Sequence, residues 1–267
     1  MAKELAEQGT SEIVAYEGME EFAAVGFSEV TTEDLAIPFF RILQNNSPQK
    51  NKRDGAYVDG AEEGMFYNTV LNKVYNGEEG ISLIPCYYNR RFVEWIPDNG
   101  GYVGEHETTS TVVAQSFKKE GDNKDWLENG NYLENTANFF CLVLDSELGP
   151  QRVQLPMSST QLKKARKWLT QAQSLTAKGA NGTFVLPMMS QVYTAKSVTE
   201  SNDYGQWFGW DINRQRGLDL SKAEDKELFD MALTFAKQVK AGEVQAKDDS
   251  AQASVEGDII EQDDGVM

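Results

Sequence analysis

The run Ile81-Ser82-Leu83-Ile84-Pro85-Cys86-Tyr87-Tyr88 decides the fold class of this 267-residue chain. It is apolar, has the length of a strand and follows the turn dipeptide Asn76-Gly77. The strand pattern continues in Arg90-Arg91-Phe92-Val93-Glu94-Trp95 until Pro97-Asp98-Asn99-Gly100 breaks it. The segment therefore predicts a meander of short strands in a β-rich core.

Similar runs occur on both sides of this segment. Ordered structure is expected to begin in the apolar run 37–43, and the polar residues 49–64 predict a surface loop. Residues 98–135 have no sustained periodicity, which predicts a long irregular segment that leaves the sheet. Further strands are predicted at residues 65–70, 73–75, 138–144, 152–155, 188–198 and 206–212.

Two helices are expected to cover the strands. The first runs from a cap at Ser158 or Ser159 to Gly179, because apolar residues recur at helical spacing between these points. The second begins at a capping-box pattern at Ser221 and ends at Gly242. Both have one apolar face, which is typical of helices that pack on a sheet.

These patterns predict an α+β fold: a mainly antiparallel β-sheet or OB-like barrel core with two covering helices and disordered acidic ends. The core is expected to span residues 35–242. We expect residues 1–34 to form an acidic N-terminal arm with one short helix near residues 18–25, and residues 243–267 to form a disordered acidic C-terminal tail.

The charge of the chain is concentrated at its two ends. Of the formal net charge of −17, residues 1–35 carry −8 and residues 248–267 carry −7. The residues between them are therefore close to neutral. Within this neutral part the bases cluster beside aromatic residues, in 87–92 and again in 163–168, so an acidic protein can still present a basic, aromatic surface.

Several classes of protein are disfavoured by composition. Cys86 and Cys141 are isolated, and His106 is the single histidine, read here as an exposed loop residue, so a Cys/His metal site and a histidine-dependent catalytic site are not expected. No phosphate-binding glycine loop, signal peptide or long apolar run is present. We expect a cytoplasmic protein that is not an enzyme, with no cofactor, no metal and no membrane partner.

The layout resembles the single-stranded-DNA-binding proteins of bacteriophages and bacteria, which combine an OB-fold core with a flexible acidic C-terminal tail. The resemblance covers the β blocks from Met65 to Ile212, the interleaved bases and aromatics, and the tail from Asp248 to Met267. It implies non-sequence-specific binding of single-stranded DNA in replication or recombination, with a possible homo-oligomer. The residues implied are Tyr87, Tyr88, Arg90, Arg91, Trp95, Lys163, Lys164, Arg166, Lys167, Trp168, Trp207 and Trp210.

In this interpretation the bases contact phosphates and the aromatic side chains stack on nucleobases. The tail competes with DNA for the basic groove and recruits replication or recombination proteins. The tail residues expected to bind these partners are Asp258, Glu261, Asp263 and Asp264.

Other interpretations of the same residues stay open. The cations at 163–167 could be only the solvated face of a helix, and Trp207 and Trp210 could be core residues of a strand. The chain could be a non-enzymatic interaction protein, such as a DNA mimic, a host-takeover factor or a virion-associated factor. A third interpretation is a carboxylate-dependent, magnesium-using nuclease, which requires acids and a lysine to converge in one pocket.

Overall fold

The computed structural model describes residues 19–22, 25–27, 29–30, 35–98, 100–122, 124–146, 149–203 and 205–244. The chain divides into two units, Met1–Leu35 and Ala36–Met267. In the first unit Met19–Phe22 form a 3-10 helix, η1, inside the range where the sequence predicts a short helix. The predicted partner-binding residues of the tail lie outside the described residues.

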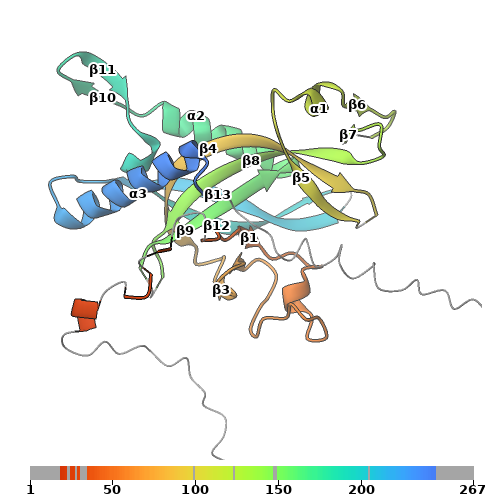
Figure 1. Ribbon diagram of the computed structural model, residues 1–267, viewed down its shortest axis with the longest axis horizontal. Coiled ribbons are helices and arrows are strands. Elements are labelled where there is room, and N and C mark those ends of the chain that lie inside the picture. The colour runs from red at the N-terminus through yellow and green to blue at the C-terminus, as the bar shows by residue number, and fades with distance from the viewer. Residues whose placement is uncertain are drawn as a thin grey trace, which may run out of the picture. The chain divides into compact units, whose positions relative to one another are not determined.

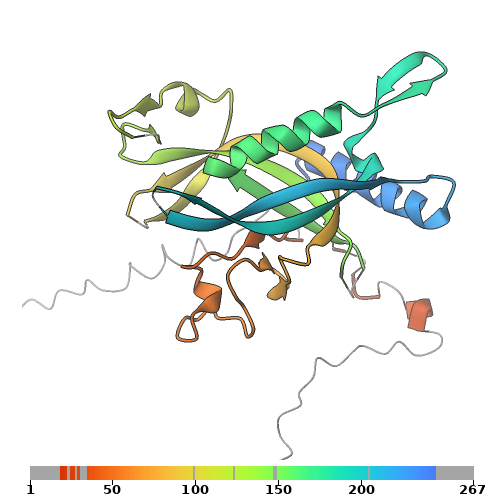
Figure 2. The same cartoon turned by 180° about the vertical axis from the view of Figure 1, so that it is seen from behind.

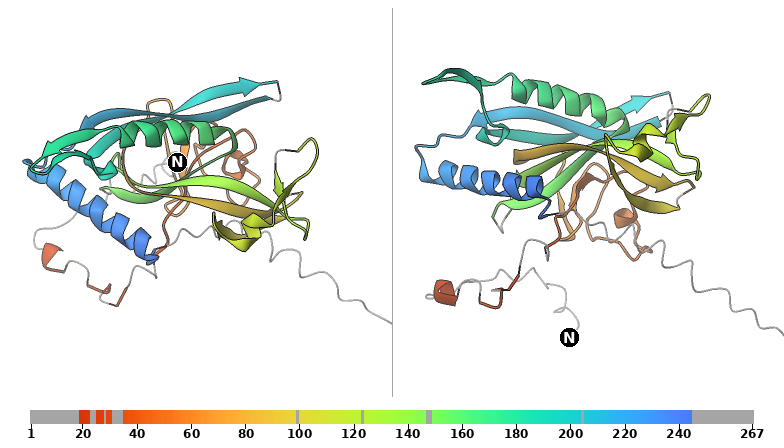
Figure 3. Two further views of the ribbon diagram at one scale, coloured as in Figure 1. Left: turned by 90° about the horizontal axis from the view of Figure 1, so that it is seen from above. Right: turned by 45° about the horizontal axis from the view of Figure 1, so that its top comes forward.

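The described part of the second unit is built on an eight-stranded sheet that curls into a half-barrel (Figure 3). Its strands pair antiparallel in the order β13, β12, β4, β8, β7, β6, with β5 also paired to β4 and β9 to β8. The strands are β4 Ile81–Ile96, β5 Gly101–Glu107, β6 Phe117–Lys118, β7 Asp125–Trp126, β8 Tyr132–Val143, β9 Gln151–Ser158, β12 Gln191–Asn202 and β13 Gly205–Gly217.

Smaller elements surround this sheet in the described ranges. A three-stranded sheet has the order β1, β2, β3, and a two-stranded hairpin joins β10 to β11. The bounds are β1 Phe40–Ile42, β2 Phe66–Asn68, β3 Lys73–Tyr75, β10 Thr176–Gly179 and β11 Gly182–Val185. The helices are η3 Pro48–Lys50, α1 Thr111–Ala114, η4 Ser159–Gln161, α2 Leu162–Gln173, η5 Met188–Ser190 and α3 Ala223–Ala241.

The two longer helices cover opposite faces of the curled sheet. Alternation along β8 sends the neighbours Phe139 and Phe140 to opposite faces. Trp168 of α2 stacks on Phe139 with ring centroids 4.1 Å apart, and Phe235 of α3 meets Phe140 at 6.2 Å. The helix α3 lies in front of the strands in Figure 1, and α2 lies in front of them in Figure 2. Each face of the sheet therefore has its own buried core.

Strand β1 lies between the two edge strands β9 and β13. Phe39, next to β1, forms a parallel bridge with Gln154 of β9. On the other side, the Gln44 side-chain amide donates to the carbonyl of Phe208 and accepts from its backbone N–H, each at 2.9 Å. These contacts bring residues that are far apart in sequence around one cavity.

The structure confirms the predicted fold class, a mainly antiparallel β fold with two covering helices. The expected strands at residues 65–70 and 73–75 are present as β2 and β3. The two runs at 81–88 and 90–95 join in one 16-residue strand, β4. Antiparallel neighbours β8 and β12 support β4 on both sides, which explains why the strand is long.

Three details of the predicted helices are wrong. The N-cap of α2 is Gln161, without a side-chain capping bond, and Gly179 belongs to β10 because the helix ends at Gln173. Ser221 does not cap α3, since its hydroxyl donates to Asp219 at 2.7 Å. The predicted end of α3 is confirmed, because Gly242 follows the helix in the left-handed conformation at φ 76°.

The predicted irregular segment at residues 98–135 is only partly correct. Its first part is β5, which pairs along β4 from Arg91 to Ile96. His106 lies in this strand, so the expectation of an exposed loop histidine is wrong. Its Nε2 atom is 2.7 Å from the buried carboxylate of Glu94. Sequence periodicity missed β5 because glycines and charged residues dominate it, and pairing with β4 supplies its order.

Candidate nucleic-acid interface

The outward face of α2 carries three exposed cations. Ala165, Trp168 and Ala172 form the buried side of this helix. Helical spacing therefore sends Lys163, Arg166 and Lys167 to solvent, and all three are exposed. Among the described residues, none of these three side chains has an ion-pair or hydrogen-bond partner. They stay available for an anion.

Lys164 of the same helix is occupied. It forms an ion pair with Glu200 of β12, which also accepts hydrogen bonds from Gln161 Nε2 and Trp207 Nε1 at 2.9 Å each. Burial alone would raise the pKa of Glu200, but the hydrogen bonds from Lys164, Gln161 and Trp207 lower it below its usual range. This network fixes the start of α2 to the β12–β13 hairpin and engages two of the predicted site residues.

The middle of β4 lies on the same face of the sheet as α2. Tyr88 contacts the Phe139 ring at 5.1 Å, and Trp168 stacks on the same ring. Arg90 follows Tyr88 by two positions and is exposed, so its guanidinium projects from this face. Its Nε donates to Asn135 Oδ1 at 2.7 Å. Tyr88, Arg90 and the α2 cations therefore belong to one surface.

Other predicted residues lie elsewhere. Tyr87, Arg91 and Trp95 are on the opposite face of β4, where Arg91 is 3.7 Å from Glu107. Trp168 and Trp210 are only 2% and 3% exposed, and both pack in the core. Trp210 stacks on Phe66 of β2 with the rings 4.8 Å apart. The role of these two tryptophans as base-stacking partners stays a prediction that their burial does not favour.

The hairpin β10–β11 was not predicted as part of the site. It follows α2 directly and projects away from the sheet beyond the end of this helix (Figure 2). Lys178 is exposed on it, and Phe184 and Val185 are 48% and 52% exposed. A signal in the sequence marks this region: residues 148–199 contain seven Lys or Arg and no Asp or Glu. Most of this acid-free stretch consists of β9, α2, the hairpin and β12.

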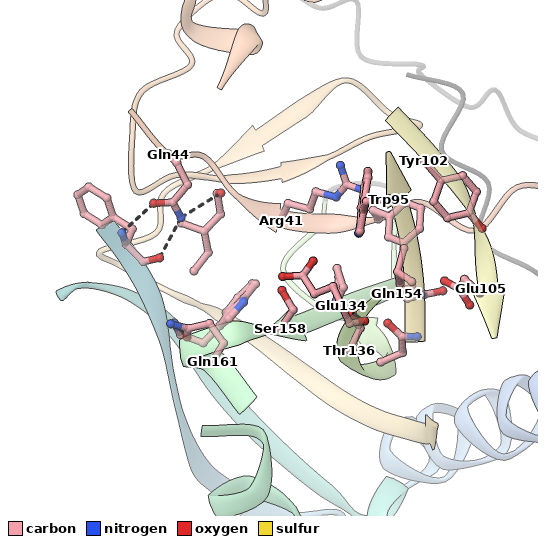
Figure 4. Close-up of a pocket in the computed structure, with 17 residues that line it drawn as sticks. Arg41, Gln44, Trp95, Tyr102, Glu105, Glu134, Thr136, Gln154, Ser158 and Gln161 are labelled. Carbon is pink, nitrogen blue, oxygen red and sulfur yellow. Dashed lines mark hydrogen bonds between the residues drawn. The ribbon is translucent and has the colours of Figure 1, made fainter. Parts of the chain in front are cut away.

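A separate cavity of about 560 Å³ lies among β1, β4, β5, β8, β9 and β13. Figure 4 shows Gln44 and Gln161 at one end of it, and Trp95, Tyr102 and Glu105 at the other. The cavity lining is Phe39, Arg41, Ile42, Gln44, Val93, Trp95, Tyr102, Glu105, Glu134, Thr136, Asn138, Gln154, Pro156, Ser158, Gln161, Phe208 and Trp210. Loss of water raises the pKa of Glu105 above its usual range, although nearby Arg91 opposes this effect.

A buried carboxylate lies beside this cavity, on strand β4. Besides its contact with His106, Glu94 accepts hydrogen bonds from Asn131 Nδ2 at 2.6 Å and from Asn129 Nδ2 at 3.2 Å. Burial alone would raise the pKa of Glu94, but the hydrogen bonds from Asn131, His106 and Asn129 lower it below its usual range. Glu94 therefore connects β4, β5 and the turn before β8.

Two further kinds of feature have no candidate among the described residues. They contain no group of three or more His, Cys, Asp or Glu side chains that could hold a metal ion. None of the helices in the described ranges is long and apolar enough to cross a membrane.

Comparison with known proteins identifies a phage family. The sequence model of the Pam3 phage gp34-like proteins matches residues 7–245, so the chain belongs to this family. Neither the curated proteins nor the solved structures include a match.

Proposed function

We propose that this member of the Pam3 phage gp34-like family binds single-stranded DNA without sequence specificity. The binding surface, called the basic face below, consists of Arg90, Lys163, Arg166, Lys167 and Lys178 with the aromatic residues Tyr88, Phe92 and Phe184. The proposed setting is phage DNA replication or recombination, in which the acidic tail recruits partner proteins. The proposal includes no catalytic step.

The observation that carries this proposal is the set of unpaired cations on α2. Lys163, Arg166 and Lys167 have no acidic partner among the described residues, although the whole chain has a formal net charge of −17. Unpaired cations on one helix face repel each other, and a bound polyanion reduces this repulsion. Phosphates of a DNA strand would neutralise them and release counterions, which is the main source of non-specific affinity.

The aromatic residues of the basic face favour a single strand over a duplex. Tyr88 and Phe92 are half-buried, so each ring keeps part of its surface open. The Arg90 guanidinium lies 5.9 Å from the centre of the Phe92 ring. Phe184 is exposed on the hairpin. Unpaired bases can stack on such rings, whereas the bases of a duplex are already stacked on each other.

The proposal is tested by the anisotropy of a labelled, mixed-sequence single-stranded oligonucleotide titrated with the full-length protein at several salt concentrations. The test variant is the triple substitution Lys163→Gln, Arg166→Gln and Lys167→Gln. Its matched control is Lys226→Gln, Lys237→Gln and Lys240→Gln, which removes the same charge from exposed positions of α3.

We expect the wild type and the α3 control to bind, with affinity that falls as salt rises. The α2 variant should bind more weakly at low salt. The slope of log K against log salt should become shallower by about two, since each lost phosphate contact on a single strand contributes about 0.7. Equal affinity and slope for the two variants, or no binding by wild type at micromolar protein in low salt, would contradict the proposal.

A further inference from the structure

We infer that the cavity among β1, β4, β5, β8, β9 and β13 binds one unstacked nucleobase. This inference rests on the proposed function for the source of the base, a DNA strand held on the basic face. The cavity residues themselves indicate the class of ligand, a flat and uncharged heteroaromatic ring with hydrogen-bond donors and acceptors.

An unpartnered side-chain amide lines the cavity. Gln154 is only 4% exposed, and its side-chain amide has no hydrogen-bond partner among the described residues. Asn138 is 1% exposed, and its Oδ1 atom is buried without a partner, as is the indole Nε1 of Trp95. Buried polar groups are almost always hydrogen-bonded in proteins. The Asn138 and Trp95 atoms are closed to the cavity space, so the Gln154 amide is the group that a ligand with both a donor and an acceptor would satisfy.

The shape and the walls of the cavity suit a nucleobase. Its volume of about 560 Å³ lies within the range of small-molecule sites. Trp95 and Tyr102 meet edge to face at 5.9 Å at one end, and Phe208 lines the other end. Proteins that take a base out of its stack hold it between apolar or aromatic side chains and read its edge by hydrogen bonds. A carboxamide such as that of Gln154 offers both a donor and an acceptor to this edge.

The charges of the cavity disfavour a phosphate. Glu105 and Glu134 line it together with one cation, Arg41, whose guanidinium lies 4.6 Å from the centre of the Phe39 ring. Two carboxylates against one guanidinium repel an anion. The phosphates of a bound strand would therefore remain on the basic face while an uncharged base enters the cavity.

Val93 and Trp95 line the cavity from the face of β4 opposite Arg90, and the cavity comes closest in sequence to the basic face at the start of α2. Gln161 lines the cavity and is followed two residues later by the exposed Lys163. Gln161 is held in place because its Oε1 accepts from the backbone N–H of Trp210 and its Nε2 donates to Glu200, each at 2.9 Å. A strand whose phosphates follow α2 thus passes the end of the cavity that Gln161 lines.

The experiment compares two labelled oligonucleotides of equal length, one with bases and one abasic, in binding to the full-length protein. Two variants alter the cavity in different ways: Gln154→Leu removes the amide with little change in volume, and Ser158→Phe fills the space. Near-ultraviolet circular dichroism confirms that each variant is folded. In a second titration, free thymidine and adenosine are added to the wild type and to Ser158→Phe.

We expect both cavity variants to bind the base-containing oligonucleotide about tenfold more weakly, the loss typical of one stacked base. Their affinity for the abasic oligonucleotide should equal that of wild type. The α2 triple variant should lose affinity for both oligonucleotides. Nucleoside binding to wild type that Ser158→Phe abolishes would support the cavity site without depending on a strand.

The inference is overturned if both cavity variants match wild type with the base-containing oligonucleotide and wild type binds no nucleoside at millimolar concentration. In that case the proposed function still stands if the α2 variant loses affinity. If wild type binds neither oligonucleotide, the proposed function fails, and the nucleoside titration alone decides whether the cavity accepts a base.

Discussion

His106 Nε2 lies 2.7 Å from Glu94 Oε2, and this contact joins the neighbouring strands β5 and β4. Glu94 also binds the side chains of Asn129 and Asn131 from the turn before β8. One buried carboxylate thus joins three segments, β4, β5 and the turn before β8. The segment 98–135, which has no regular pattern in the sequence, acquires its order partly from this group.

Replacing Glu94 should therefore destabilise the protein. Glu94→Gln removes the negative charge that accepts the hydrogen bonds from Asn129 and Asn131, so we expect a loss of about 2 to 3 kcal/mol in the free energy of unfolding at pH 7. Urea denaturation measures this value. The control is Glu107→Gln, because Glu107 is exposed and its contact with Arg91 is long.

The effect of Glu94→Gln on the free energy of unfolding should also depend on pH. The pKa of Glu94 is lowered in the folded state. The carboxylate therefore stabilises the fold fully at pH values above the ordinary pKa of a glutamate, and this stabilisation is lost as the pH falls through the lowered pKa. The difference in unfolding free energy between wild type and Glu94→Gln should shrink below about pH 4. A difference that stays constant down to acid unfolding would contradict this account.

Asp225 at the start of α3 should stabilise the fold over a similar range of pH. It is buried, it accepts two hydrogen bonds from Arg216 at 2.6 and 2.8 Å, and it accepts a third from the backbone N–H of Asp219. The hydrogen bonds from Arg216 and Asp219 lower its pKa to about 2, against the opposing effect of burial. Asp225 therefore contributes fully to the stability of the fold when the pH is above the pKa that it has in the unfolded chain, and this contribution declines as the pH falls toward 2.

We expect Asp225→Asn to reduce the free energy of unfolding by about 2 to 3 kcal/mol at pH 7 and by progressively less between pH 4 and pH 2. Denaturation with urea across this range measures the difference. Asp230→Asn, an exposed change on the same helix, serves as the control. An equal loss for both variants would show that the charge of α3, rather than the Arg216 contact, is responsible.

Trp168 should act as a core residue rather than as a stacking partner for DNA. It is 2% exposed and lies between Phe139 and Tyr193. We expect Trp168→Ala to lower the free energy of unfolding by about 3 to 5 kcal/mol, as other large-to-small core changes do. Phe184→Ala on the exposed hairpin should change it by less than about 0.5 kcal/mol. Thermal unfolding of both variants tests the contrast, and equal midpoints would contradict it.

The acidic tail should compete with DNA. Residues 248–267 carry seven acidic residues and no base. Deleting them should tighten the binding of single-stranded DNA at low salt, and high salt should reduce the gain because charge screening weakens the competition. A control of equal length, with every tail Asp and Glu replaced by Asn and Gln, should behave like the deletion. Unchanged affinity of the truncated protein would exclude autoinhibition by the tail.

The basic face could have been predicted more closely from the sequence. Arg90 and Arg91 are neighbours in a strand, so alternation already places them on opposite faces, although both were grouped as phosphate contacts. The acid-free stretch 148–199 also marks the basic region, including Lys178. Neither signal requires knowledge of the fold, because both depend on order along the chain.

The cavity could not have been predicted in this way. Its residues come from positions between Phe39 and Trp210, on six strands or the segments next to them. Gln154 and Asn138 are ordinary polar residues in strand-like runs, and nothing local distinguishes them from solvent-facing positions. They are buried because strands from distant parts of the sequence pack around them. The same holds for Glu94 and His106, which meet only because β5 pairs with β4.

The sequence by itself determined the class of fold, most of the strands and the two longer helices. Short-range periodicity and turn residues specify these features, and each acts over a few residues. The tertiary structure decided which aromatic residues are buried, which cations stay unpaired and where the cavity forms. These properties depend on contacts between segments that are distant in sequence, such as Trp168 with Phe139 and Lys164 with Glu200. Such contacts form only when the chain folds, because the pairing and register of the strands bring these segments together.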